Sequence, residues 1–307
     1  MTGLRPALKD YLLIRRRVGY QLTADERLLE NFVAFIERSG AVRITTELAV
    51  RWAKLPADAQ PHRWRQRLGI VRAFARYLAT IDPASEVPSK DLLPATRPRV
   101  APYIYAPAEI TALMSAAAAL TPRLRGATYE TVIGLMASSG LRLGEALGLD
   151  RHDVDLNDGA LHVRARQTKQ RDVPLHASTT DALRAYARER EREWTAPDTP
   201  AFFLNTRGER LTKPEFNPTF AKLIGQVGLE GRGERVRPRP HDLRHTLAIR
   251  TLLDWHHAGV DVDRQMPLLS TFLGHVDPES TYWYLQAVPE LMALIRSRLE
   301  QLPELLS

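Results

Sequence analysis

The chain has 307 residues, of which 44% are hydrophobic and 26% charged, and it contains no cysteine. This composition is typical of a folded globular protein, and it excludes disulfide bonds and thiolate metal sites. No apolar run reaches the roughly 18 residues that a membrane span needs, and residues 1–5 lack the apolar core of a secretion signal. We therefore expect a cytoplasmic protein, and the length favours two domains.

The positive charge lies near the N-terminus. Residues 1–98 contain 17 Lys and Arg against 10 Asp and Glu, an excess of seven that equals the net charge of +7 for the whole chain. Codon bias can explain arginine in place of lysine, but it does not explain more cations than anions. The first third of the chain is therefore predicted to bind a polyanion such as nucleic acid.

The same third is predicted to be helical. Apolar spacing predicts helices over 9–17, 24–38, 46–54 and 61–80. The last of these also carries arginines away from its apolar face, namely Arg63, Arg65, Arg67, Arg72 and Arg76. A solvated amphipathic helix is the common explanation of such a pattern. The lack of interleaved carboxylates favours contact with DNA phosphates instead.

Proline then separates this region from a second domain. Residues 82–107 contain six prolines and little helical periodicity, which is typical of an extended linker. We predict a DNA-binding domain over 1–95, a linker over 96–106 and a second domain over 107–307. The elements predicted for that domain are helices at 107–120, 127–138, 144–149, 179–193, 214–227, 242–255, 267–273, 279–285 and 289–302, and strands at 160–166 and 172–175. The expected fold class is mainly α with a small β-sheet or hairpin.

Two separate segments offer side chains that can hold a phosphodiester. Arg142 lies in the string Gly140-Leu141-Arg142-Leu143-Gly144-Glu145, with Glu145 about one helical turn beyond it. His241 and Arg244 lie three residues apart at a predicted helix start. Guanidinium groups clamp two phosphate oxygens and stay charged, and imidazoles donate hydrogen bonds or move protons near neutral pH.

These segments have other interpretations. A single arginine at a helix start is most often a surface residue. His241 and His245, four apart on one helix face, could ligate a metal. However, the zinc-hydrolase pattern places Glu directly after the first histidine, and here that residue is Asp242. We predict no metal and no cofactor.

The segments around Arg142 and Arg244 are followed by Leu273-Gly274-His275 and then by Tyr284. In this order they resemble the tyrosine recombinase (phage integrase) family, in a transposon-type or Xer-like form. The resemblance extends from about residue 9 to the C-terminus. It implies an N-terminal helical, SAM-like core-binding domain and a C-terminal mixed α/β catalytic domain. It also implies that the pair of domains closes around duplex DNA as a clamp.

The resemblance implies a role for each matching residue. Tyr284 would attack the scissile phosphate, and the charge of the transition state would be stabilised by Arg142, His241, Arg244 and His275. Glu145 would support the site, with Asp242 and His245 as further auxiliary residues. Tyr282 is a second tyrosine in this string, but the spacing of nine residues from His275 favours Tyr284. An aromatic cluster here would otherwise be interpreted as core packing.

The predicted hairpin carries the remaining candidate. In the family a hairpin lysine protonates the leaving 5′-oxygen, and Lys169 matches it, although this hairpin is about two residues shorter than usual. Arg166 and Arg171 compete for the position, but an ammonium group gives up a proton and a guanidinium group does not. Arg166 and Arg171 are instead predicted to contact DNA, together with Arg237 and Arg239.

The resemblance implies a site-specific recombinase that makes a 3′-phosphotyrosine intermediate without metal or ATP. The expected partners are double-stranded DNA with an inverted-repeat core site, other copies of the chain in a tetramer, and accessory recombination proteins. We expect a bacterial protein associated with the nucleoid and no membrane partner. The apolar helix at 289–302 would either exchange between copies or pack on its own domain. A type IB topoisomerase-like enzyme and an inactive DNA-binding protein are the alternatives.

Overall fold

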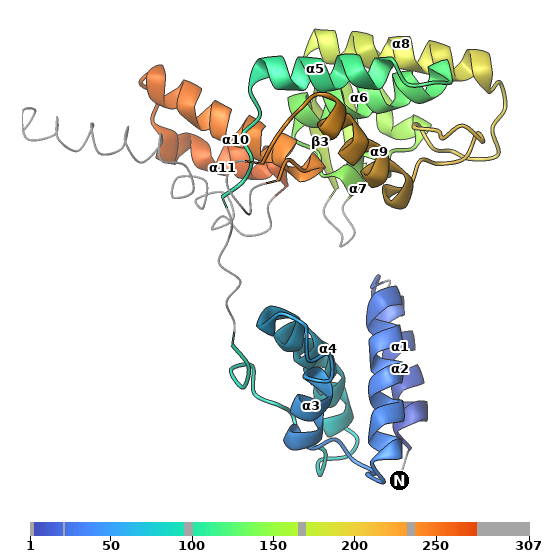
Figure 1. Cartoon of the computed structure of the whole chain (residues 1–307), viewed down its shortest axis with the longest axis vertical. Coiled ribbons are helices and arrows are strands. Elements are labelled where there is room, and N and C mark those ends of the chain that lie inside the picture. Colours follow the sequence, from blue (N-terminus) through green and yellow to red (C-terminus); the bar gives the residue numbers. More distant parts are fainter. Residues whose placement is uncertain (1–2, 21, 95–100, 165–169, 232–236, 275–307) are drawn as a thin grey trace, which may run out of the picture. The chain divides into compact units, whose positions relative to one another are not determined.

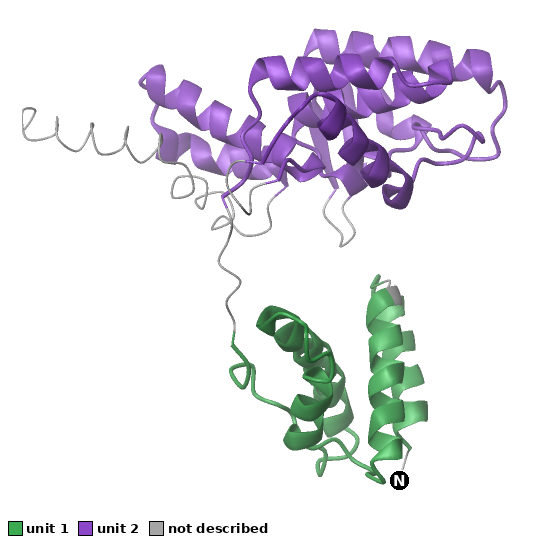
Figure 2. Ribbon diagram, in the orientation of Figure 1, with its two compact units in different colours: residues 1–99 green, residues 100–307 purple. Residues whose placement is uncertain are grey.

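The chain divides into two compact units, residues 1–99 and residues 100–307 (Figure 2). The computed structural model describes residues 3–20, 22–94, 101–164, 170–231 and 237–274. Residues 101–106, which the sequence assigns to the linker, include Tyr103 and Tyr105, and both are buried in the core of the second unit. Their rings pack edge to face with centroids 4.9 Å apart. The second unit therefore begins before its first helix.

The described residues of the first unit form a bundle of four helices. These are α1 (Leu4–Arg17), α2 (Thr23–Arg38), α3 (Thr46–Ala53) and α4 (Pro61–Ala79). Trp52 is fully buried at the centre and packs edge to face on Phe32, while its indole Nε1 donates to Asn31 at 2.9 Å. Thr45 caps α3 by accepting a bond from the backbone N–H of Leu48 at 3.2 Å.

The second unit is built around a buried helix. This is α6 (Arg123–Ser139), which packs against α5 (Pro107–Ala118), α8 (Ala177–Glu193) and α10 (Pro240–His257) (Figure 1). Most residues of α6 that face these neighbours are buried and apolar, among them Val132, Ile133 and Met136. A helix that is apolar around most of its circumference is expected at the centre of a domain.

Shorter elements complete the unit. The remaining described helices are α7 (Leu143–Ala146), the 3₁₀ helix η1 (Arg151–Asp153), α9 (Lys213–Gln226) and α11 (Val262–Leu273). α10 and α11 form a smaller apolar cluster of their own, which includes Ile249, Leu252 and Leu269.

The sheet has three antiparallel strands in the order β1-β2-β3. They are β1 (Val154–Asp155), β2 (Ala160–Arg164) and β3 (Gln170–Pro174). The register pairs Leu161 with Val173 and Arg164 with Gln170. Side chains alternate between the two faces of β3, where Val173 is fully buried and Arg171 lies on the same face.

The predicted fold class, mainly helical with a small sheet, is confirmed. The short strand β1 was not predicted, because two residues are too few to show a period. The helices predicted at 279–285 and 289–302 lie outside the described residues. Within the residues that the structure describes, no helix is long and apolar enough to cross a membrane.

Candidate active site

A glycine turn at the end of α6 positions Arg142. Gly140 ends the helix with φ of 64°, a left-handed conformation that L side chains rarely adopt. A Cβ atom there would lie 2.8 Å from Cδ2 of Leu273, so the position is also too crowded for a side chain. Leu141, fully buried, anchors the turn, and Arg142 then begins α7 as its N-cap residue.

Arg142 and Glu145 bond to each other at two places. The Arg142 backbone N–H donates to Glu145 Oε2 at 2.9 Å, and Arg142 Nη1 donates to Glu145 Oε1 at 2.9 Å. The Arg142 side chain is 41% exposed, whereas that of Glu145 is 10% exposed. The Arg142 guanidinium group is therefore held by the Glu145 carboxylate on one side and remains open to a ligand on the other.

Arg171 holds Glu145 from the other side. Its Nη1 and Nη2 atoms donate to the two carboxylate oxygens at 3.2 and 3.0 Å, and its Nε donates to the carbonyl oxygen of Phe272 at 3.1 Å. Only 10% of the Arg171 side chain is exposed. The predicted DNA contact by Arg171 therefore has little free surface in this conformation. The period of two along β3 places Arg171 on the face of buried Val173, a signal in the sequence that would have indicated an inward position.

Arg244 is fully buried at the centre of the site. Its Nη1 donates to the carbonyl oxygen of Gly140 at 2.7 Å and its Nη2 to that of Leu273 at 2.6 Å. These bonds tie the turn after α6 to the end of α11.

Three arginines bond to three consecutive carbonyl oxygens at the C-terminus of α11, residues 272–274, which we call the carbonyl row. The donors, in order along the row, are Arg171 at 3.1 Å, Arg244 at 2.6 Å and Arg142 at 3.3 Å. The last carbonyl groups of a helix have no intrahelical partner and carry partial negative charge. The carbonyl row therefore gathers cations that would otherwise repel one another.

His241 lies at the start of α10, beside this cluster. The residue as a whole is exposed, but desolvation of its ring, together with the positive charges of Arg244 and Arg142, lowers its pKa to about 4. The imidazole is therefore neutral at neutral pH. The ring of His245 lies edge to face with that of His241, with centroids 4.5 Å apart.

Asp242 fixes the start of α10. It is fully buried and accepts bonds from the backbone N–H, Nε and Nη2 of Arg239 at 2.9, 3.1 and 2.9 Å. Burial raises the pKa of Asp242, against the opposing hydrogen bonds from Arg239. The Arg239 side chain remains 56% exposed, so it can bond to Asp242 and still meet solvent.

The arginines of α4 fall into two groups. Arg67 lies over the ring of Trp52 at 3.8 Å and donates to the Trp52 carbonyl oxygen at 3.1 Å, while Arg65 donates to that of Leu93 at 3.2 Å. Arg63 and Arg76 are exposed. In the second unit Arg237 is also exposed.

Arg72 is intermediate in exposure between these two groups of α4 arginines, since it is half-buried. Four predicted site residues lie outside the described residues, and these are Arg166, Lys169, His275 and Tyr284.

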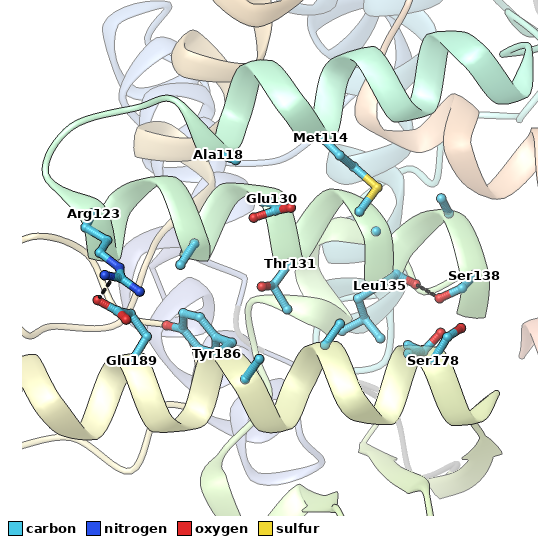
Figure 3. A pocket seen from close by; sticks show the side chains of 16 residues that line it. Met114, Ala118, Arg123, Glu130, Thr131, Leu135, Ser138, Ser178, Tyr186 and Glu189 are labelled. Atoms are coloured by element: carbon cyan, nitrogen blue, oxygen red, sulfur yellow. Dashed lines mark hydrogen bonds and ion pairs between the residues drawn. The ribbon is translucent and has the colours of Figure 1, made fainter.

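A cavity of about 730 Å³ lies elsewhere, between α5, α6 and α8 (Figure 3). It is lined largely by apolar side chains such as Met114 and Leu135, and Arg123 pairs with Glu189 at 3.1 Å at its edge. None of the predicted site residues lines it. The cavity is therefore separate from the arginine cluster.

One group of potential metal ligands occurs among the described residues. It consists of Asp150, His152 and Asp153. Arg210 pairs with Asp150 and Arg164 with Asp153, so guanidinium groups already neutralise both carboxylates.

The candidate residues of the second unit lie in a part of the chain that matches a known protein family. A sequence profile of the phage integrase family matches residues 105–290, more than half of the chain. The chain belongs to the phage integrase family. Members of this family are the tyrosine recombinases, which carry out site-specific DNA recombination, and the chain is a DNA breaking and rejoining enzyme.

Individual tyrosine recombinases resemble the chain over nearly its whole length. The y4rB protein of Sinorhizobium fredii, named as an integrase/recombinase, is 42% identical over 98% of each chain. The structure of the Tn1549 transposon integrase with transposon right-end DNA covers 97% of this chain and 100% of its own, with 17% identity and a TM-score of 0.65. A lambda integrase tetramer bound to a Holliday junction covers 91% and 79%, with 17% identity and a TM-score of 0.57. Both structures show the same fold.

Glu145 makes a testable contribution to the stability of this recombinase. Burial alone would raise the pKa of Glu145, but hydrogen bonds from Arg171 and from the Arg142 backbone outweigh it and lower the pKa to about 2. Because the folded pKa lies below the unfolded value, the stabilisation is present above about pH 5 and is lost as the pH falls towards 2. We expect the free energy of unfolding to fall by up to about 3 kcal/mol over this range, and solvent screening makes the loss smaller.

Urea unfolding of wild type and Glu145→Gln between these pH values checks the prediction. The stability difference between them should shrink as the pH falls. A difference that stays constant with pH would contradict it.

Proposed function

We propose that the chain cuts and rejoins duplex DNA at a specific site through a 3′-phosphotyrosine on Tyr284, without metal or ATP. The observation that carries this proposal is the carbonyl row with its arginines. It brings Arg142 and Arg244, which lie 102 residues apart in the sequence, to one helix end beside His241. Two guanidinium groups near a neutral imidazole suit the charge of a pentavalent phosphate.

The proposed reaction exchanges one phosphodiester for another. The Oη of Tyr284 loses its proton to solvent and forms a bond to phosphorus, and the bond to the 5′-oxygen breaks. Lys169 gives its proton to that oxygen, which leaves as a hydroxyl group. A 5′-hydroxyl of a partner strand reverses the steps and releases the tyrosine. The bond energy is kept in the covalent intermediate, so no nucleotide is consumed.

The residues around the phosphate would share its charge. Arg142 has the exposed guanidinium group, so it would contact a non-bridging oxygen most directly. His241, neutral above about pH 4, would donate one hydrogen bond, and an approaching phosphate would raise its pKa. His275 would donate another. Asp242 would hold the start of α10, and His245 would support the ring of His241.

We further propose that the first unit, residues 1–99, is the DNA-binding domain and that the second unit, residues 100–307, is the catalytic domain. DNA phosphates would be contacted by the exposed arginines among the candidates, namely Arg63, Arg76, Arg237 and Arg239. The related structures contain transposon DNA in one case and a tetramer on a Holliday junction in another. By analogy the chain would act as a tetramer on two inverted-repeat sites.

Covalent trapping tests this function. The chain is expressed in bacteria that carry a plasmid library of fragments from its source genome, the cells are denatured rapidly, and DNA attached to the captured protein is sequenced. Recovery of one inverted-repeat sequence, joined through its 3′-phosphate, is expected. Scattered adducts would favour topoisomerase-like relaxation, and the absence of adducts would favour a DNA-binding protein without catalysis.

A further inference from the structure

Arg171 connects two parts of the candidate site that lie far apart in the sequence. Its Nη1 and Nη2 atoms bond to Glu145, 26 residues away, and its Nε bonds to the carbonyl oxygen of Phe272, 101 residues away. One side chain on β3 therefore joins the turn that carries Arg142 to the C-terminus of α11.

The bonds to the Glu145 carboxylate are shared equally between two arginines. Oε1 accepts from Arg142 Nη1 at 2.9 Å and from Arg171 Nη1 at 3.2 Å. Oε2 accepts from the Arg142 backbone at 2.9 Å and from Arg171 Nη2 at 3.0 Å. A two-atom guanidinium fork fixes the plane of a carboxylate. The orientation of the Arg142 guanidinium therefore depends on that of Arg171.

The Arg171 guanidinium group packs closely against the backbone of Gly274. A Cβ atom at Gly274 would lie 2.5 Å from Arg171 Nη1, so only a glycine permits this approach. The next residue in the sequence is His275. Arg171 thus holds the carbonyl row immediately before a residue that the proposed mechanism uses.

We propose that Arg171 is a positioning residue that sets the Arg142 guanidinium through Glu145 and holds the carbonyl row against it. This inference rests on the proposed function. Arg171 does not touch the phosphate; it fixes the groups that do. Its 10% exposure argues against a direct DNA contact. A lysine could not replace it, because one ammonium group cannot make a two-atom bond to the carboxylate and also reach the Phe272 carbonyl.

Single-turnover cleavage tests the proposal. The probe is a labelled duplex of the sequence recovered covalently attached to the wild-type chain. We expect Arg171→Gln to lower the cleavage rate at saturating protein by about 10²-fold, because a small misplacement of a catalytic group has that effect. The dissociation constant for the same duplex should be unchanged. Arg184→Gln is the matched control, since Arg184 also bonds to a carboxylate and a carbonyl, those of Asp181 and Leu156, both at 2.6 Å.

The pH profile separates positioning from simple loss of structure. In wild type the pKa of Glu145 is about 2, so this carboxyl stays charged throughout the range from about pH 5 to pH 8. Without Arg171 the burial that raises this pKa remains, while the hydrogen bonds that lower it most are lost. The Arg171→Gln rate should therefore fall more steeply towards acid pH than the wild-type rate. Arg184→Gln should keep the wild-type profile.

A double-variant comparison gives the final test. If Arg171 acts through Glu145, Arg171→Gln should have little further effect on the rate of Glu145→Gln. Additive effects, an unchanged Arg171→Gln rate or a changed dissociation constant alone would overturn the proposal. If Arg171→Gln does not fold, Arg171→Lys keeps the charge, and it should still cleave more slowly than wild type. If wild type itself forms no adduct, the proposed function fails.

Discussion

Replacement of Tyr284 by phenylalanine is expected to abolish the covalent DNA adduct completely. Phenylalanine lacks the hydroxyl oxygen that would form the bond to phosphorus, and no other atom of the side chain can replace it. The ring is retained, so packing and DNA binding should be nearly unchanged. The measurement compares adduct yield after rapid denaturation with binding of the same duplex in a gel-shift assay.

Tyr282→Phe is the matched control, since it removes the same atom two residues earlier in the chain. Both tyrosines lie outside the described residues, so the choice between them rests on sequence spacing alone. Tyr282→Phe should keep the adduct. If Tyr282→Phe loses the adduct and Tyr284→Phe keeps it, the nucleophile has been assigned to the wrong tyrosine. If both keep it, the tyrosine mechanism is contradicted.

The helices could be predicted from sequence where apolar spacing was regular. The predicted 46–54 and 61–80 differ by one residue at their ends from α3 and α4. α6 begins at Arg123, earlier than the predicted 127, because its first turn contains Arg123, Arg125 and Gly126 and therefore shows no apolar spacing. Residues 101–106 were predicted as linker from their composition, which cannot show that Tyr103 and Tyr105 are buried.

Sequence motifs selected candidate site residues, but they did not indicate how these residues bond to one another. Sequence motifs selected Arg142, Glu145, His241 and Arg244, and the structure brings the first two together and places His241 where Arg244 and Arg142 lower its pKa. The sequence did not indicate that the arginines bond to the carbonyl row, because backbone carbonyls carry no sequence signature. The same reason applies to the bond from Arg171 to the Phe272 carbonyl oxygen, whereas the inward position of Arg171 follows from the alternation along β3.

The arginines of α4 show a similar limit. Composition predicts that a group of arginines binds phosphate, but it does not distinguish an exposed guanidinium from one that packs on a ring. Arg67 lies on Trp52, and Arg65 bonds to the Leu93 carbonyl oxygen, whereas Arg76 is exposed. Direct DNA contact is therefore better supported for Arg76 than for Arg67.

Arg244→Ala is expected to reduce the rate of adduct formation by about 10²–10⁴-fold, the range seen when one preorganised charge-stabilising group is removed. The substitution should also destabilise the fold, because Arg244 is fully buried and bonds to the carbonyl oxygens of Gly140 and Leu273. Each carbonyl left without a partner should cost about 1–3 kcal/mol. Urea unfolding and adduct kinetics measure the two effects separately.

Arg190→Ala separates chemistry from stability. Arg190 is 1% exposed on α8 and donates to the Ala201 carbonyl oxygen at 2.9 Å, so its loss should also destabilise the fold. Its rate per folded molecule should nevertheless match wild type, whereas that of Arg244→Ala should not. Equal rates for the two variants would mean that Arg244 only supports the fold. A lower rate for Arg244→Ala alone would mean that the buried guanidinium group stabilises the transition state while it holds α11 to the turn after α6.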